Sequence, residues 1–165
     1  GLLNVHQCLL KPNEDGIVVI PLYWLKIPPL AFYGCQSLKA IQFPNRSNIV
    51  SIGNWAFSRS NLQYIQIPNT ISIIRELAFE HCKQLASFTF EANSVLKTIS
   101  NAAFECSTLK DISIPSSVTS LQNYVFVNCV NLENVVFEEN SQITILPFYL
   151  FKSCVSLKSI RIPEK

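Results

Sequence analysis

Methionine is absent from the sequence, glycine occurs only four times and histidine only twice, and charged side chains are scarce. Charged residues make up 15% of the chain, where an average soluble domain carries about 25%. Thirteen basic and eleven acidic residues leave a net charge of +2, too small to indicate binding to nucleic acid or to an anionic membrane. So few glycines offer no phosphate-binding loop. The absence of methionine even at position 1 suggests a processed form or a segment of a longer protein.

Apolar residues are abundant instead, at 48% of the chain with a mean hydropathy of +0.26. This composition excludes a disordered chain, because enough apolar surface exists to offset the entropy of ordering. Residues 16–34 form an apolar stretch that is long enough to suggest a membrane span. Three prolines and Lys26 within it would break a helix and place a charge in lipid. We therefore expect no membrane insertion in this segment.

An internal repeat dominates the chain. Six segments share a small or apolar residue, then Phe, a short polar turn often containing Cys, and Leu-x-x-Ile-x-Ile or a close variant. The anchoring aromatics, spaced by 25, 22, 25, 22 and 25 residues, are Phe32, Phe57, Phe79, Phe104, Phe126 and Phe151. Further residues, nearly all aliphatic, stand five and eight positions before each Phe. A single turn cannot cover so many apolar side chains, so we expect the turns to stack around one continuous core.

The last part of each repeat is predicted to be a β-strand, because its two final apolar residues alternate with polar ones. Strands that recur once per turn in the same direction must pair in parallel. The sequence therefore predicts a solenoid with one short parallel β-strand per 22–25-residue turn and irregular or short helical returns on the convex side. The longer turns insert Asn/Ser-rich excursions at residues 45–48, 92–94 and 139–141, which we expect to bulge from one edge.

The two ends of the chain depart from the regular repeat. Residues 1–23 lack a Phe anchor, and we interpret them as a divergent first turn or an N-terminal cap ahead of a single solenoid domain over residues 24–165. At the other end a strand is completed and no polar cap follows. The apolar side of the last turn would then be exposed. Either further repeats follow in a parent protein, or two copies form a homodimer through the C-terminal repeat.

The pattern Leu-x-x-Ile-x-Ile-Pro followed by Ile-x-x-x-x-Phe-x-x-Cys-x-x-Leu resembles the BspA-like leucine-rich repeats, a family found in surface proteins of bacteria and parasitic protists. The resemblance covers residues 24–165 and recurs six times. It implies a leucine-rich repeat solenoid in an extracellular or cell-surface protein that adheres to host proteins or neighbouring cells. It supplies no catalytic residues. Ser60 departs from the pattern at the Cys position of the second repeat.

The cysteines have no spacing typical of a metal site, because no Cys-x-x-Cys pair is present. Five of the six occupy what we take to be equivalent points in successive repeats: Cys35, Cys82, Cys106, Cys129 and Cys154. Parallel side chains in such a ladder point the same way, which is poor geometry for a disulfide. We therefore expect a column of buried, reduced thiols. Cys8 is unplaced, and the redox compartment stays open.

Neither histidine indicates catalysis. His81 lies beside Cys82 in a variable turn, but no third group that would orient a His–Cys nucleophile is evident. We predict that the chain is not an enzyme and binds no cofactor or metal. Asn45-Arg46-Ser47 is a glycosylation sequon in one of the excursions, and this candidate site at Asn45 weakly favours secretion.

The outward row of the predicted sheet is the best candidate for a binding surface. If the apolar strand residues point inward, the row consists of Ala40, Gln42, Tyr64, Gln66, Ser87, Thr89, Asp111, Ser113, Asn134, Val136, Ser159 and Arg161. It is small, polar and nearly neutral, and it could line a broad concave face. Such a face favours shape fit and many hydrogen bonds over steering by charge. We expect a protein ligand from a host, a matrix or another cell surface.

Two other roles remain open from the sequence. The chain could be a structural or self-associating spacer, with the outward row as its merely soluble side. It could also be an intracellular protein-interaction scaffold, which free thiols would permit.

Overall fold

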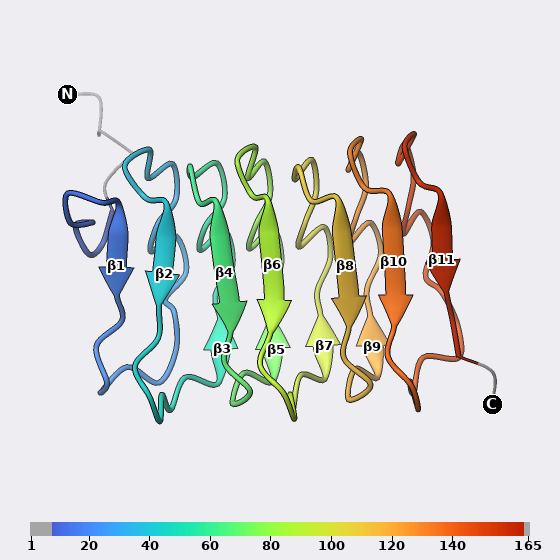
Figure 1. The fold of residues 1–165 in the computed structure, drawn as a ribbon, viewed down its shortest axis with the longest axis horizontal. Helices are drawn as coiled ribbons and strands as arrows, with labels where there is room; N and C mark the ends of the chain where they lie inside the picture. The colour runs from blue at the N-terminus through green and yellow to red at the C-terminus, as the bar shows by residue number, and fades with distance from the viewer. Residues whose placement is uncertain (1–7, 164–165) are drawn as a thin grey trace.

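Successive turns of the chain stack along a single axis in the computed structural model, which describes residues 8–163 (Figure 1). One strand from each turn lies on the same side of the stack, and all of these front strands run in the same direction. They are β1 (Ile17–Val19), β2 (Ala40–Gln42), β4 (Tyr64–Ile67), β6 (Ser87–Phe90), β8 (Asp111–Ile114), β10 (Asn134–Phe137) and β11 (Ser159–Arg161). The predicted parallel solenoid is confirmed, with its strands where the apolar alternation placed them.

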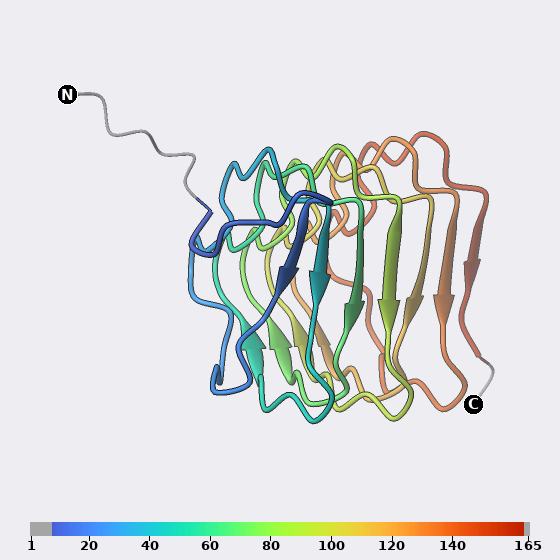
Figure 2. The ribbon, with the colours of Figure 1, turned by 60° about the vertical axis from the view of Figure 1, so that its left-hand side comes forward.

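The return path contains a second parallel sheet that the sequence did not indicate (Figure 2). Its back strands are β3 (Ser51–Ile52), β5 (Ile73–Ile74), β7 (Thr98–Ile99) and β9 (Ser120–Leu121). The described residues contain no helix, so the returns are short strands and turns, without the short helical alternative. No segment of residues 8–163 is therefore a candidate for a membrane-spanning helix.

The segments around the six phenylalanines have an unusual backbone. We call residues 30–34, 55–59, 77–81, 102–106, 124–128 and 149–153 the Phe turns. Two positions before and two after each Phe, the backbone is left-handed, with φ angles between 52° and 63°. Every second N–H group then donates to the next turn, as Phe57 does to the carbonyl of Ala78 at 2.8 Å. This ladder offsets a conformation that costs about 1–2 kcal/mol per non-glycine residue.

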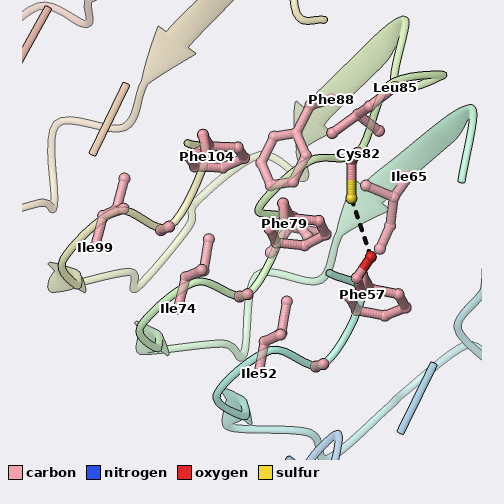
Figure 3. Close-up of a cluster of buried hydrophobic side chains, with 14 of the residues drawn as sticks. Ile52, Phe57, Ile65, Ile74, Phe79, Cys82, Leu85, Phe88, Ile99 and Phe104 are labelled. Atoms are coloured by element: carbon pink, nitrogen blue, oxygen red, sulfur yellow. Dashed lines mark hydrogen bonds between the residues drawn. The ribbon is translucent and has the colours of Figure 1, made fainter. Parts of the chain in front are cut away.

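The phenylalanine rings form a column inside the stack (Figure 3). Consecutive rings are nearly parallel, with centroids 5.1–5.7 Å apart from Phe32 to Phe151. The first five rings are fully buried, and aliphatic residues from the front and back strands surround them. Because each ring from Phe57 to Phe126 is covered by the rings before and after it, the core is continuous along the axis, as predicted.

A column of small polar side chains lies beside the rings, and it corrects one prediction. The thiols of Cys82, Cys129 and Cys154 donate to the carbonyls of Phe57, Phe104 and Phe126 at 3.0–3.1 Å. Ser60 and Ser107 occupy the same column, and each contacts the sulfur of the next turn. The placement of Cys106 in this column was wrong, because Ser107 holds that position and Cys106 is the left-handed residue before it.

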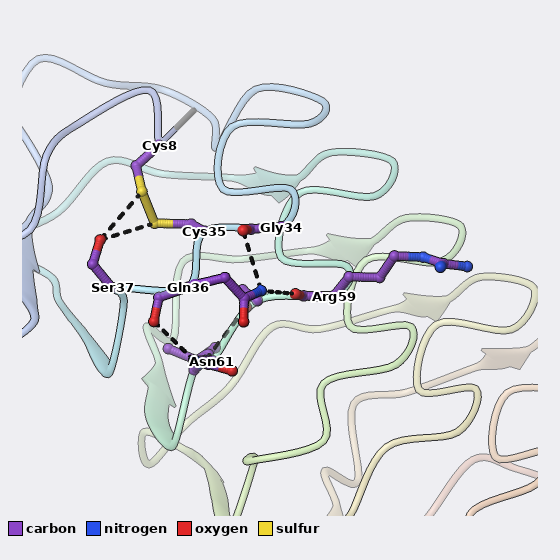
Figure 4. Close-up of a disulfide and its surroundings, with 9 residues drawn as sticks. Cys8, Gly34, Cys35, Gln36, Ser37, Arg59 and Asn61 are labelled. Atoms are coloured by element: carbon purple, nitrogen blue, oxygen red, sulfur yellow. Dashed lines mark hydrogen bonds between the residues drawn. A yellow bond between two sulfur atoms is a disulfide. The ribbon is translucent and has the colours of Figure 1, made fainter. Parts of the chain in front are cut away.

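The expectation of a reduced thiol at Cys35 was also wrong, because Cys35 forms a disulfide with Cys8 (Figure 4). Cys8 belongs to no repeat, so it reaches Cys35 from outside the ladder and the unfavourable ladder geometry does not apply. The backbone of this segment is also joined to the first Phe turn, where Leu9 N–H donates to the carbonyl of Ala31 at 2.8 Å. Farther along, β1 pairs in parallel with β2. Residues 8–23 are thus tied to the stack covalently and by hydrogen bonds.

The C-terminal turn exposes its apolar side, as the sequence predicted. Ile160 and Ile162, whose counterparts in earlier turns are mostly buried, are 39% and 51% exposed. Leu146, which corresponds to buried residues on the back strands, is 39% exposed. The cause is the position of this turn at the end of the stack, where no following turn covers it in the described chain.

Candidate functional site

The predicted outward row lies on the front strands, on the side away from the phenylalanine rings. Its side chains are exposed or half-buried from Gln42 to Arg161. Ala40 is the exception, because it is fully buried. Tyr64 is the largest exposed side chain of the row, at 47%. The alternation therefore placed every residue of the row correctly except Ala40.

The front sheet is interrupted between β6 and β8. Strands β1, β2, β4 and β6 form one sheet and β8, β10 and β11 another. Within residues 8–163, no backbone hydrogen bond joins β6 to β8. The pairing of β2 with β4 is weak as well, with a single partner pair, Ala40 and Tyr64. The back strands, where β5 pairs with β7, and the Phe turns continue across the same junction without a break.

Two features of the sequence account for the interruption. Both weak junctions precede a repeat in which the link from Phe to Leu is one residue shorter, five positions against six. At the second junction a phenylalanine also replaces the usual isoleucine or valine. The Phe88 ring lies edge-on to Phe79 and Phe104, with centroids 5.0 and 4.8 Å away. Its bulk occupies the space between two turns and holds β6 away from β8.

A groove of about 480 Å³ opens on the outward face at this interruption. Its walls combine apolar and polar groups, which are Phe88, Thr89, Phe90, Asp111, Ile112, Ser113, Asn134, Val136 and Glu138. Five of these belong to the predicted row: Thr89, Asp111, Ser113, Asn134 and Val136. The groove was not predictable from the repeat pattern, although the aromatic at position 88 was a visible departure from it.

Unpaired backbone groups face this groove. In a parallel strand, successive residues direct their N–H and C=O groups alternately to the two neighbouring strands. Glu91 N–H donates back to Ile67, so by alternation Phe88 and Phe90 direct their backbone groups toward β8. Glu138 N–H donates to Ile114, so Asp111 and Ser113 face β6. These groups can hydrogen-bond to a ligand because no strand pairs with them.

A chain of side-chain hydrogen bonds crosses the three strands on one side of the groove. Asn134 Nδ2 donates to Asp111 Oδ1 at 2.6 Å, and Ser159 Oγ donates to Asn134 Oδ1 at 2.8 Å. These residues are register partners on β8, β10 and β11. The bonds fix the orientation of the Asn134 amide and therefore give this part of the row a defined pattern of donors and acceptors.

Charge on this face is locally balanced. Arg161 Nη2 pairs with Glu139 Oε1 at 3.2 Å. Glu133 pairs with Lys158 and Lys110 at 2.6 and 3.6 Å. The hydrogen bond from Lys158, together with the charge of Lys110, lowers the pKa of the Glu133 carboxyl. Asp111 and Glu138 leave the groove itself slightly acidic.

The His81–Cys82 pair does not form a nucleophile. Burial raises the pKa of the Cys82 thiol to about 12, and the thiol donates a hydrogen bond to the carbonyl of Phe57. His81 Nε2 instead lies 3.2 Å from Glu80 Oε1, which also binds Arg59 Nη2 at 3.1 Å. The other oxygen of Glu80 accepts from the fully buried Ser58 hydroxyl. This arrangement joins adjacent turns, with the carboxylate at its centre.

Two further points concern the glycosylation sequon and metal binding. Asn45 is exposed, at the tip of the first excursion, and the next residue, Arg46, has a φ of 63°. Its side chain is thus accessible for the predicted modification. Among residues 8–163, no group of three or more His, Cys, Asp or Glu side chains is arranged to hold a metal ion.

Comparisons with known proteins give consistent results. A family model described as "BspA type Leucine rich repeat region (6 copies)" matches residues 17–133 and 50–165. No match is found among curated proteins. Among solved structures, a leucine-rich repeat protein from Treponema pallidum is 28% identical, with a TM-score of 0.81 over 90% of this chain and 70% of that chain.

Two longer proteins also match. A leucine-rich repeat protein from Bacteroides ovatus is 32% identical, with a TM-score of 0.75 over 89% of this chain and 39% of that one. The pneumococcal vaccine antigen PcpA is 29% identical, with a TM-score of 0.74 over 80% of this chain and 34% of that one. This chain thus spans between a third and two fifths of the length of these two proteins.

Proposed function

This chain belongs to the BspA-type leucine-rich repeat family, and from that premise we propose that it is a non-enzymatic adhesion module of a secreted or cell-surface protein. It binds proteins of a host or of neighbouring cells through the outward row of the front strands. The family and its fold are typically non-enzymatic, and the solenoid architecture offers extended surfaces suited to protein binding.

The groove between β6 and β8 is the observation that carries this proposal. A continuous sheet would present only side chains, whereas here backbone donors and acceptors are left unpaired beside the Phe88 and Phe90 rings. A polar extended segment of a partner protein can hydrogen-bond to these groups and to Asn134 while it covers the apolar wall. Tyr64, on the same face, adds a residue type that is enriched where binding energy concentrates.

Two observations support a location outside the cell. The disulfide between Cys8 and Cys35 suits an oxidising compartment, because disulfides are rare in reducing ones. The pneumococcal relative is a vaccine antigen, which accords with display at a cell surface. We further propose that Asn45 carries a glycan when the chain passes through a eukaryotic secretory pathway. Expression in such a host should give a mass shift that Asn45→Gln removes.

Binding to intact host cells and to immobilised purified matrix proteins tests the function directly. We expect saturable binding that Ser113→Arg, which fills the groove, weakens by about tenfold or more. Tyr64→Ala and Arg161→Ala test the row on either side of the groove. Lys97→Ala is a matched control, because Lys97 is exposed beside back strand β7. If Ser113→Arg and Tyr64→Ala both bind as the unmodified protein does while Lys97→Ala is impaired, the front face is not the binding surface.

The exposed C-terminal turn favours a second candidate, self-association. Ile145, Phe148 and Val155 are about four-fifths exposed, and apolar patches of this kind mark interaction sites. A homodimer through this turn would cover them. Sedimentation would then detect a dimer that Ile160→Asp with Ile162→Asp dissociates, whereas a monomer at all concentrations excludes this role. An intracellular scaffold, which the four free thiols would permit, requires that Cys8 and Cys35 be reduced in native material.

A further inference from the structure

A column of side chains, all but one of them large and mostly apolar, lines the outside of the stack, on the opposite side of the Phe turns from the core. Each stands two positions before a core phenylalanine, at the first left-handed position. The column consists of Leu30, Trp55, Leu77, Ala102, Tyr124 and Tyr149. All except Leu77 and Ala102 are more than a third exposed, and Leu77 is half-buried.

The fold does not require bulk at these positions. A left-handed backbone favours glycine or asparagine, and a bulky residue there is strained. The side chains of Trp55, Tyr124 and Tyr149 contribute little to the core, because they are 37–55% exposed. Burial is therefore only partial at these strained positions, and packing alone does not account for aromatic side chains there.

The column has one gap, at Ala102. Ala102 is only 9% exposed and lies at the floor of a hollow of about 590 Å³, between Leu77 on the turn before and Tyr124 on the turn after. Tyr124 stacks on Tyr149 through one face, with ring centroids 5.2 Å apart and planes 12° from parallel. Its other face therefore looks along the axis toward Ala102, where nothing in the described chain stacks on it.

The size of the gap selects a flat occupant. Neighbouring rings in this protein lie about one turn apart, at 5.1–5.7 Å in the core column and 5.2 Å between Tyr124 and Tyr149. Because position 102 carries only a methyl group, there is room for one planar group between Leu77 and Tyr124. An aromatic ring or a guanidinium group has this shape.

The charged residues that line the hollow favour a guanidinium group over an aromatic ring. Glu76 and Glu105 line the hollow, and neither forms an ion pair within residues 8–163. Two unpaired carboxylates beside a free tyrosine face attract a cation. The molecule already uses this chemistry one turn later, where Lys152 Nζ lies 5.2 Å from the centroid of the Tyr149 ring. Position 127, which corresponds to Lys152 in the Tyr124 turn, is a valine.

We infer that the hollow at Ala102 binds the guanidinium group of an arginine side chain presented by a partner protein. The guanidinium stacks on the free face of Tyr124 and hydrogen-bonds to the carboxylates of Glu76 and Glu105. Arginine is favoured over lysine because its flat, delocalised cation both stacks on rings and pairs with carboxylates in fixed geometry. This site is separate from the groove between β6 and β8 and does not depend on the proposed function.

Titration with Nα-acetyl-arginine amide, followed by amide chemical shifts of the folded protein, tests the site without the natural partner. Saturable shifts should appear at Leu77, Ala102, Glu105 and Tyr124. The lysine analogue should bind more weakly, and the citrulline analogue, which has the same shape without charge, should give no saturable shift. Nα-acetyl-tryptophan amide tests whether shape alone suffices.

Three variants identify the contacts. Ala102→Tyr completes the column and should abolish the shifts, since tyrosine is tolerated in the same backbone conformation at position 124. Glu76→Gln with Glu105→Gln keeps the shape and removes the charge, and Tyr124→Leu removes the ring face, which should weaken binding by about two- to fivefold. Glu91→Gln is the matched control for a carboxylate elsewhere. Equal binding of citrulline, tighter binding of the tryptophan analogue, or unchanged binding by the double glutamine variant would each overturn the assignment.

Discussion

Replacing Phe104 by alanine tests whether the stacked rings hold the turns together. The ring is fully buried, with centroids 5.3 Å from Phe79, 5.4 Å from Phe126 and 4.8 Å from Phe88. Removal of a buried phenylalanine side chain costs about 3–5 kcal/mol through lost transfer energy and the cavity left behind. Each ring pair contributes about 0.5–1.5 kcal/mol beyond burial, part of which the first figure already contains. We expect Phe104→Ala to lower the free energy of unfolding by about 4–5 kcal/mol.

The same substitution at the end of the column provides the comparison. Phe151 is half-buried and has one ring neighbour, Phe126, at 5.7 Å, so Phe151→Ala should cost about 1–2 kcal/mol. Phe148 is 80% exposed, and Phe148→Ala should change stability by less than about 0.5 kcal/mol. Urea unfolding followed by circular dichroism and tryptophan fluorescence measures all three. Equal losses at positions 104 and 151 would refute a core shared between neighbouring turns.

Three further perturbations have defined outcomes. Cys8→Ser should lower stability by about 3 kcal/mol, because the disulfide closes a loop across 27 residues, and hydrogen exchange should show β1 opening first. Burial raises the pKa of the Cys82 thiol from 9.0 to about 12, so the folded state retains a proton that the unfolded state loses. The contribution of this thiol to stability is full below pH 9 and falls by about 1.4 kcal/mol per pH unit between pH 9 and 12. Cys82→Ser, which copies the residue at Ser60, should lack this extra fall in alkaline urea titrations. Glu80→Ala should lower the free energy of unfolding by about 1–3 kcal/mol, because it leaves the buried Ser58 hydroxyl without its acceptor. Thermal unfolding measures this loss, and a neutral result would mean that the hydrogen bond contributes nothing to stability.

The repeat period predicted the larger features of the fold, because they follow from covering one apolar face per turn. The front strands, the phenylalanine column and the exposed last turn all depend on that requirement. The outward row followed from strand alternation, which failed only at Ala40. The back strands were missed because they are two residues long, and an alternation of two residues has no recognisable period.

The remaining differences come from single residues. Counting back from the strand leucines puts Cys106 level with Cys82, since each stands three residues before its leucine. The short repeats, however, lose one residue between this column and the leucine, so Ser107 is the true equivalent. The pairing of Cys8 with Cys35 joins a segment outside the repeat and has no periodic signal. The groove depends on the size of one ring, Phe88, at a position where the repeat pattern requires only an apolar residue.

Hydrogen exchange in the presence of a bound partner tests the central claim most directly. Amide hydrogen exchange would be measured on the chain alone and on its complex with a matrix or cell-surface protein to which it binds saturably. We predict added protection at residues 87–90 and 111–114, where unpaired backbone groups face the groove, with no change at back strands β5 and β7. Protection confined to the back strands or to the C-terminal turn, with the groove unaffected, would contradict recognition through the front face.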